Sequence, residues 1–235
     1  MIAQFDRLFD QARPAFGQER TFARARTLAM SALVGLGRRT ISGMLCASAQ
    51  QFGDWSAAYR LFEQERFDRE ALFAPALREV LERLEPGQPL VAMMDDTLIH
   101  KRGRKVYGTG WRRDPLGPPF AANFVWGQRF LQISAAVPSA PTGPGQARGV
   151  PLDLVHAPSA PRPRKTASVE MWKEYRRQQQ SMKISAVGAG QLAALRHRLD
   201  GEASGKDRPL IMPVDGGFTN RAVFRSTPAN TILIG

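Results

Sequence analysis

The sequence predicts an α/β protein: a helical domain over residues 1–86, then a mixed sheet with flanking helices over residues 87–235. Two observations lead to this class. Apolar residues recur at helical spacing as far as about residue 85, whereas from Leu90 onward they come in short uninterrupted runs that are typical of strands. Pro86 and Gly87 separate the two patterns, because proline and glycine end helices.

The helical domain is expected to contain a series of helices, each defined by apolar spacing and by the residue that caps its start. They are a helix around Phe5–Phe9, one from Phe22 to Leu36 that ends at Gly37, one over Thr40–Ala49 that Thr40 or Ser42 opens, one that begins at Asp54, and one over Arg69–Leu84 that Asp68 caps. Gly35–Thr40 places a tight turn and two arginines before a helix start, as a DNA-reading element would. A plain helical bundle is the alternative for this domain.

The second domain is expected to begin with the apolar run Leu90–Met94, a strand that is covered on both faces and ends at Asp95 and Asp96. The other expected strands are 123–137, Val150–His156, Pro209–Val214 and Thr231–Ile234. Short loops join the first three strands, so these strands are expected to pair antiparallel.

Two proline-rich connections, 138–144 and 157–165, are expected to lack regular structure. Between the strands, helices are expected to start after Thr166 or Ser168, to continue over Ile184–Leu199, and to recur around 220–224.

Asp95 and Asp215 both follow apolar strands, and such strands can be neighbours in one sheet. Carboxylates a few ångströms apart repel each other unless a cation lies between them, and Mg²⁺ (or Mn²⁺) prefers carboxylate oxygens and water. The pattern therefore predicts Asp95 and Asp215 as catalytic ligands of a two-metal site for phosphoryl transfer. Asp96, one pleat away and on the opposite face of the strand, is the rival first ligand. A turn residue after a strand is the alternative for each aspartate.

The chain is strongly basic: 33 Lys and Arg stand against 21 Asp and Glu, which gives a formal charge of +12. Such a charge favours nucleic acid as a partner, because each phosphate contact releases counterions. A generic basic surface is the alternative. The candidate DNA contacts lie in basic runs, and they are Lys101, Arg102, Arg104, Lys105, Arg112, Arg113, Arg162, Arg164 and Lys165.

Composition also excludes several classes of protein. No apolar run approaches the roughly 20 residues that a membrane span requires, and the first residues lack the basic and then apolar order of a signal peptide. The lone Cys46 excludes an internal disulfide framework and a thiolate zinc site. We therefore expect a cytoplasmic protein without a membrane partner.

The order of these motifs resembles the insertion-sequence transposases of the DDE superfamily, from about Asp54 onward. The resemblance lies in Val91–Thr97, in the basic run 101–105 and in Val214–Asn220. That family has an RNase H-like catalytic domain whose first acid lies in a pattern close to Asp-x-Thr, whose second acid follows the fourth strand, and whose glutamate lies on a later helix. Asp95 matches the first acid and Asp215 the second.

The resemblance implies a Mg²⁺-dependent DNA transposase that cuts insertion-sequence ends, joins the exposed 3′-hydroxyl to target DNA and can form a homo-oligomer. Residues 216–235 contain no Asp or Glu, so the family's glutamate has no counterpart there. Glu170 and Glu174 precede Asp215 and lie in the wrong order. We therefore expect an incomplete RNase H-like domain over 87–235, in a truncated chain that is inactive alone.

Two other functions are compatible with the sequence. One is a non-catalytic DNA-binding remnant that inhibits an intact transposase by occupying its DNA ends. The other is a basic RNA-binding protein with no metal site. Metal binding that depends on Asp95 and Asp215 separates the RNA-binding protein from the other two functions.

Overall fold

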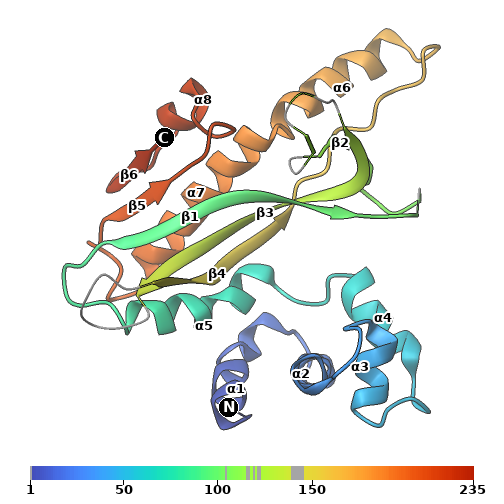
Figure 1. Ribbon diagram of the computed structural model, residues 1–235, viewed down its shortest axis with the longest axis vertical. Helices are drawn as coiled ribbons and strands as arrows, with labels where there is room; N and C mark the ends of the chain where they lie inside the picture. The colour runs from blue at the N-terminus through green and yellow to red at the C-terminus, as the bar shows by residue number, and fades with distance from the viewer. Residues whose placement is uncertain (1, 104, 115–116, 119, 121–122, 139–145) are drawn as a thin grey trace. The chain divides into compact units, whose positions relative to one another are not determined.

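The computed structural model describes residues 2–103, 105–114, 117–118, 120, 123–138 and 146–235 (Figure 1). It divides into two compact units, Met1–Arg78 and Glu79–Gly235. Helices come first and a mixed sheet with flanking helices follows, so the predicted α/β class is confirmed. The arrangement is consistent with an RNase H-like fold.

The first part of the chain is helical, as its apolar spacing predicts. Its elements are α1 (Ile2–Gln11), the short 3-10 helix η1 (Arg13–Ala15), α2 (Glu19–Val34), α3 (Ile41–Ala47), α4 (Trp55–Glu63) and α5 (Arg69–Leu81). Thr40, Asp54 and Asp68 each accept a hydrogen bond from a backbone N–H at a helix start, so these predicted caps are confirmed. A cluster that includes Phe16 and Leu28 forms the core of this unit.

Three predicted helix ends are wrong. The second helix ends at Val34 and not at Gly37, because the backbone of Gly35 is already extended while its N–H closes the last turn on the carbonyl of Ser31. The third helix ends at Ala47 and not at Ala49, because Ala49 has a positive φ of 56°. The fifth helix ends at Leu81 and not at Leu84, because the backbone hydrogen bonds that follow join residues three apart, as in a 3-10 helix, and not four apart.

The second unit is built on one mixed sheet. Its strands are β1 (Leu90–His100), β2 (Gly110–Arg113), β3 (Phe124–Pro138), β4 (Ala147–His156), β5 (Leu210–Pro213) and β6 (Thr231–Ile234). They lie in the order β2-β3-β1-β5-β6, and β4 also pairs with β3. β3 pairs antiparallel with β1 and β4, as the short loops predict, and also with β2, whereas β5 pairs parallel with β1 and β6.

The sheet differs from the sequence prediction in three respects. β2 was not expected, because Trp111 is its only apolar side chain and one such residue does not form a strand pattern in the sequence. β1 does not end at Asp95 and Asp96 but runs on to His100, because its pairing with β3 continues that far. It is also not covered on both faces, since Met93 is 44% exposed. The proline-rich connection 138–144 falls almost entirely on residues 139–145, which lie outside the described residues.

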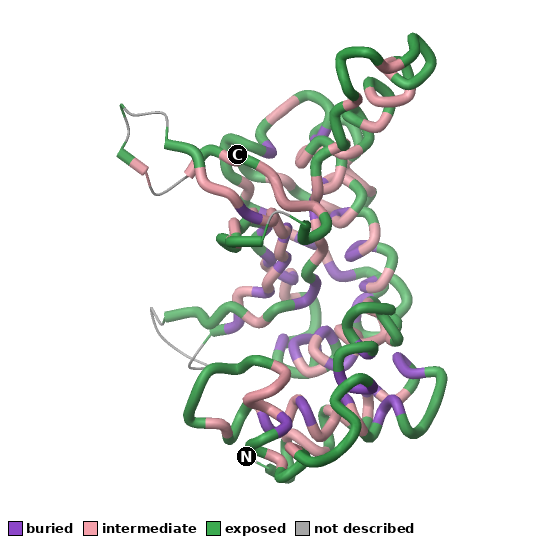
Figure 2. The backbone as a smooth tube through the Cα atoms, turned by 90° about the vertical axis from the view of Figure 1, so that its right-hand side faces the viewer, coloured by how far each residue is buried: buried purple, intermediate pink, exposed green. Residues whose placement is uncertain are grey.

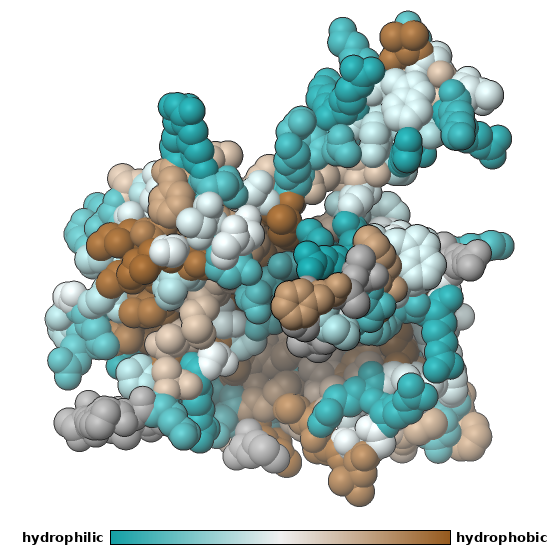
Figure 3. All heavy atoms as spheres, turned by 45° about the horizontal axis from the view of Figure 1, so that its top comes forward, coloured by the Kyte–Doolittle hydropathy of each residue, from teal (hydrophilic) through white to brown (hydrophobic). Residues whose placement is uncertain are grey.

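Three helices accompany the sheet: α6 (Val169–Ser181), α7 (Ile184–Gly201) and α8 (Arg221–Arg225). Ser168 caps α6 and Asn220 caps α8. α7 runs along one face of the sheet, and its side chains Leu192, Leu195 and Leu199 are fully buried (Figures 1 and 2). By contrast, α6 has no buried residue and extends away from the sheet, largely covered by hydrophilic side chains (Figures 1 and 3).

Gly188 allows α7 to approach the loop that follows β5. A Cβ atom at Gly188 would lie 2.7 Å from the ring of Phe218 and 3.3 Å from the terminal methyl of Met94. Phe218 is 1% exposed and lies three residues after Asp215. The contact between helix and ring therefore helps to hold the backbone that carries Asp215.

We expect Gly188→Ala to lower the free energy of unfolding by about 1–3 kcal/mol, because a methyl group overpacks this contact. In helix interiors alanine is otherwise favoured over glycine by about 1 kcal/mol. Gly190→Ala is the matched control, because a Cβ there would meet no described atom within 4 Å. The free energy of unfolding of this variant should rise by up to about 1 kcal/mol. Urea denaturation measures both, and equal stabilities would contradict the packing role of Gly188.

Candidate metal centre

β1 brings two carboxylates to the point where it separates from its parallel neighbour. Leu90 and Val91 pair with β5, and an isolated bridge joins Met94 to Val214. Beyond this bridge β1 continues only beside β3. Asp95 and Asp96 therefore lie within β1, at the carboxyl end of its parallel section, which is where open α/β sheets place their ligands.

Asp215 follows the other strand of this bridge, so the parallel register places it beside Asp95. The backbone carbonyl of Asp215 accepts the N–H groups of Phe218 at 3.0 Å and Thr219 at 3.1 Å. Its carboxylate oxygen Oδ1 accepts the N–H of Gly217 at 3.0 Å. Asp215 is thus a turn residue, as the alternative interpretation held, and its carboxylate is held by the same turn.

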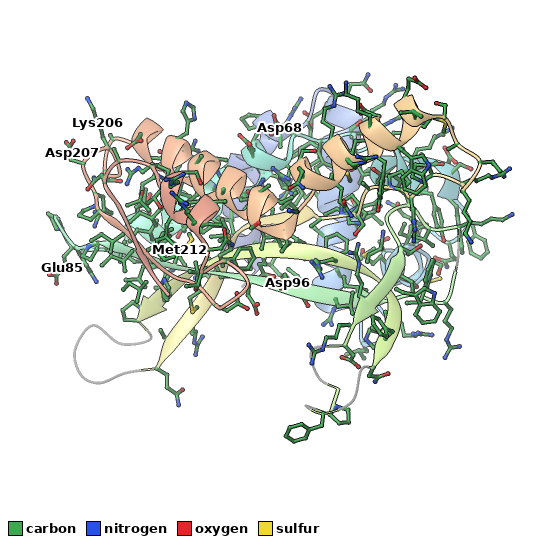
Figure 4. All side chains as sticks on the ribbon, turned by 90° about the horizontal axis from the view of Figure 1, so that it is seen from above. Asp68, Glu85, Asp96, Lys206, Asp207 and Met212 are labelled. Carbon is green, nitrogen blue, oxygen red and sulfur yellow. The ribbon has the colours of Figure 1, made fainter. Side chains whose placement is uncertain are left out.

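The three aspartates come together. Asp95, Asp96 and Asp215 each offer a carboxylate oxygen, and these oxygens lie within 4.8 Å of one another. Asp95 and Asp215 are exposed, whereas Asp96 is half-buried on β1 (Figure 4). Neighbouring strand residues point to opposite faces, yet Asp96 reaches the cluster as well.

Asp96 also has a cationic partner. Arg129 Nε lies 3.2 Å from Asp96 Oδ2. Burial raises the pKa of Asp96 above the ordinary carboxyl value; Arg129 opposes this, and the negative charges of Asp95 and Asp215 add to it. The charges of the ionised cluster therefore repel one another, and Arg129 opposes this effect at Asp96.

The donor set fits a divalent metal ion. Asp95, Asp96 and Asp215 supply hard oxygen ligands, two of them open to solvent, and Mg²⁺ prefers a few carboxylate oxygens together with water. Burial is the main cause of the raised pKa of Asp96, and a bound cation would offset the smaller contribution from the charges of Asp95 and Asp215. The residues of this cluster are those that the sequence predicts as metal ligands, although their coordination of metal stays a prediction.

The predicted DNA contacts fall into two groups. Arg102, Lys105, Arg113, Arg162, Arg164 and Lys165 are exposed, and Lys101 and Arg112 are partly buried. Arg104 lies outside the described residues. Of the exposed arginines, Arg162 lies over the ring of Trp172 at 5.8 Å. Within the described part of the chain, no carboxylate forms an ion pair with any of these six exposed cations, so they are open to an external anion.

Sequence reasoning missed Arg129. Asp96 pairs with Leu131 across the β1–β3 ladder, so Arg129 is its diagonal neighbour on the same face. The only signal in the sequence is the alternation of side chains between the two faces of the strand along 129–137. This alternation predicts which face of the sheet Arg129 lies on, but not which residue of the neighbouring strand it contacts.

Fold and site together define a class: a mixed α/β domain with three clustered aspartates suited to divalent metal. A family model described as DDE superfamily endonuclease matches residues 11–229. The chain therefore belongs to the DDE superfamily of endonucleases. The match begins well before Asp54, from which the resemblance was expected to run. A search of curated proteins returns no match.

Within the described residues no helix is long and apolar enough to cross a membrane. This finding agrees with the absence of long apolar runs in the sequence.

Proposed function

We propose that this chain provides the metal- and DNA-binding part of an insertion-sequence DNA transposase. The observation that carries the proposal is the cluster of Asp95, Asp96 and Asp215, with carboxylate oxygens within 4.8 Å, in a chain of the DDE superfamily of endonucleases. Transposase chemistry cuts a DNA strand and joins the exposed 3′-hydroxyl to target DNA. Insertion-sequence ends and target DNA are therefore the proposed substrates, in a cytoplasmic protein that forms a homo-oligomer.

The proposal gives each acidic residue a role. Asp95 and Asp215 would hold Mg²⁺ or Mn²⁺, with Asp96 as an additional ligand that Arg129 keeps oriented. When bound in a two-metal site, the cations supply activation of the attacking oxygen and stabilisation of the leaving oxygen. The turn at Gly217 fixes the Asp215 carboxylate before any substrate arrives.

We expect Asp95→Asn and Asp215→Asn each to weaken Mn²⁺ binding at least about tenfold, because even residues outside the first ligand shell alter metal affinity 10–100-fold. Asp96→Asn should have the smaller effect, since Arg129 already neutralises part of its charge. Titration calorimetry of the full chain measures all three affinities.

Asp207→Asn is the matched control, because Asp207 is an exposed aspartate of the same unit outside the cluster. Unchanged Mn²⁺ affinity in both the Asp95 and the Asp215 variant would exclude a shared metal site. Each variant should keep or raise the melting temperature of the metal-free protein, since it removes a repelling charge. This second readout separates a lost ligand from a lost fold.

A second candidate is a non-catalytic DNA-binding protein that competes with an intact transposase for its ends. The observation that favours it is that, among the described residues, the acidic cluster consists of Asp95, Asp96 and Asp215 and includes no Glu. Both candidates bind DNA, and cutting distinguishes them. The RNA-binding alternative has no metal site, so metal affinity that depends on Asp95 and Asp215 would exclude it.

A further inference from the structure

A cavity of about 580 Å³ lies beside the aspartate cluster, within the second unit. The cavity is lined by Arg112 of β2 and Arg129 of β3, by the loop Ala157–Ala160, by the end of α6 and by the start of α7. Arg129 also pairs with Asp96, so this side chain links the cavity to the candidate metal centre. Among the described residues, no Asp or Glu lines the cavity.

Arg112 carries hydrogen-bond donors that the described residues leave unused. Its Nη1 donates to Ser159 Oγ at 2.5 Å. Its Nε and Nη2 are inaccessible to solvent and have no hydrogen-bond partner among the described residues. Buried donors are nearly always paired in folded proteins, and an unpaired one costs stability. Nε and Nη2 together carry three N–H groups without an acceptor in the described part of the chain, on a guanidinium that lines the cavity.

The start of α7 adds further donors. Lys183 is the residue before the helix, no side chain caps the first turn, and the first turn carries no acidic residue. Lys183, Ile184 and Ser185 line the cavity. The first N–H groups of a helix have no partner within the helix, and their combined dipole favours an anion.

The cations of the cavity also repel one another. Burial lowers the pKa of the Arg112 guanidinium and the charge of Arg129 lowers it further, while Asp96 opposes both. Asp96 is the only acidic residue among the causes of this shift. An additional anion between Arg112 and the start of α7 would satisfy the unpaired donors and offset the repulsion.

We propose that this cavity binds a phosphate group of the DNA strand, next to the phosphodiester that the aspartates would hold. The proposal rests on the proposed function for the identity of the strand. Arginine suits this role because its planar fork donates two parallel hydrogen bonds to phosphate oxygens. The cavity is in the size range of small-molecule sites.

The first test uses inorganic phosphate and the full chain without metal, in the presence of a chelator. Titration calorimetry should detect binding, and Arg112→Gln should weaken it at least about tenfold, as loss of a charge-assisted hydrogen bond predicts. Arg148→Gln is the control, because Arg148 is exposed on β4 and loses the same charge. Equal affinities for the wild type and Arg112→Gln, or equal losses in both variants, would overturn the proposal.

Melting curves decide whether Arg112 is only structural. Because Arg112→Gln removes unpaired buried donors and a like charge, its melting temperature should stay equal or rise. A lower melting temperature with unchanged phosphate affinity would assign Arg112 to packing and overturn the proposal. Arg112→Lys keeps the positive charge but lacks the paired donors of the guanidinium, so its phosphate affinity should fall several-fold. This variant replaces Arg112→Gln in the test if Arg112→Gln does not fold.

The second test identifies the source of the phosphate. In a set of duplexes, single phosphates are replaced by neutral methylphosphonates, and binding is measured without metal. At one position the replacement should lower the DNA affinity of the wild type about tenfold and leave the DNA affinity of Arg112→Gln unchanged. This result is expected when the replaced phosphate and Arg112 interact directly. If inorganic phosphate binds but no position is coupled to Arg112, the DNA assignment is wrong. Neither test needs metal, so their failure is distinct from failure of the metal site.

Discussion

The affinity of this chain for duplex DNA is expected to fall roughly a thousandfold between 50 and 200 mM salt, if about six phosphates are contacted. Six of the predicted contacts are exposed: Arg102, Lys105, Arg113, Arg162, Arg164 and Lys165. Each neutralised phosphate releases counterions, so the logarithm of the binding constant falls linearly with the logarithm of salt concentration. Fluorescence anisotropy with a labelled duplex measures this slope.

A triple variant tests whether the contacts are specific to the basic runs. Replacing Arg162, Arg164 and Lys165 by Gln should remove about three phosphate contacts. Each contact contributes about 0.9 to the slope of log affinity against log salt concentration, so the slope should become shallower by roughly 2.7. The control replaces three other exposed cations of the same unit, Arg148, Lys206 and Arg225. If both variants change the slope equally, a generic basic surface is the better description. If the affinity of the wild type does not depend on salt, the positive charge is incidental to DNA binding.

Local patterns in the sequence predicted the ends of those helices and strands that are determined by residues close in the sequence. Thr40 and Asp54 identify helix starts because each side chain caps the N–H groups that follow it. The bounds of β6 follow from the apolar run Thr231–Ile234 alone. By contrast, the length of β1 depends on pairing with β3, since its last residues, from Asp95 to His100, are mostly polar. A long-range ladder has no local signature in the sequence.

The same distinction applies to the site. Asp95 and Asp215 could be proposed as neighbours because each follows an apolar strand, and a parallel register between such strands brings their ends together. The role of Arg129 depends on the register of an antiparallel pair, which fixes it diagonally opposite Asp96. The cavity at Arg112 depends on four separate segments, and no spacing in the sequence joins them.

Plasmid nicking by this chain alone is expected to be absent, or equal to that of Asp95→Ala, in both Mg²⁺ and Mn²⁺. The described residues bring three aspartates together, and one of these, Asp96, already pairs with Arg129. Two-metal phosphoryl transfer needs ligands that place both cations around the reacting phosphate, and losing such stabilisation costs roughly 10²–10³ in rate for each group removed. Binding of metal and DNA should persist where cutting does not.

Glu170 and Glu174, the two other acids considered from the sequence, lie outside the aspartate cluster. Glu174 pairs with Arg177 at 2.8 Å, and hydrogen bonds from Arg177 and Gln178 lower its pKa. Glu170 is exposed at the start of α6, and hydrogen bonds with its own backbone N–H and with Ser168 lower its pKa. The decisive measurement compares supercoiled-plasmid nicking by the chain with that by Asp95→Ala and Asp96→Ala. Metal-dependent nicking that is lost in both variants would show that Asp96 serves as the third ligand and that this chain is a complete nuclease.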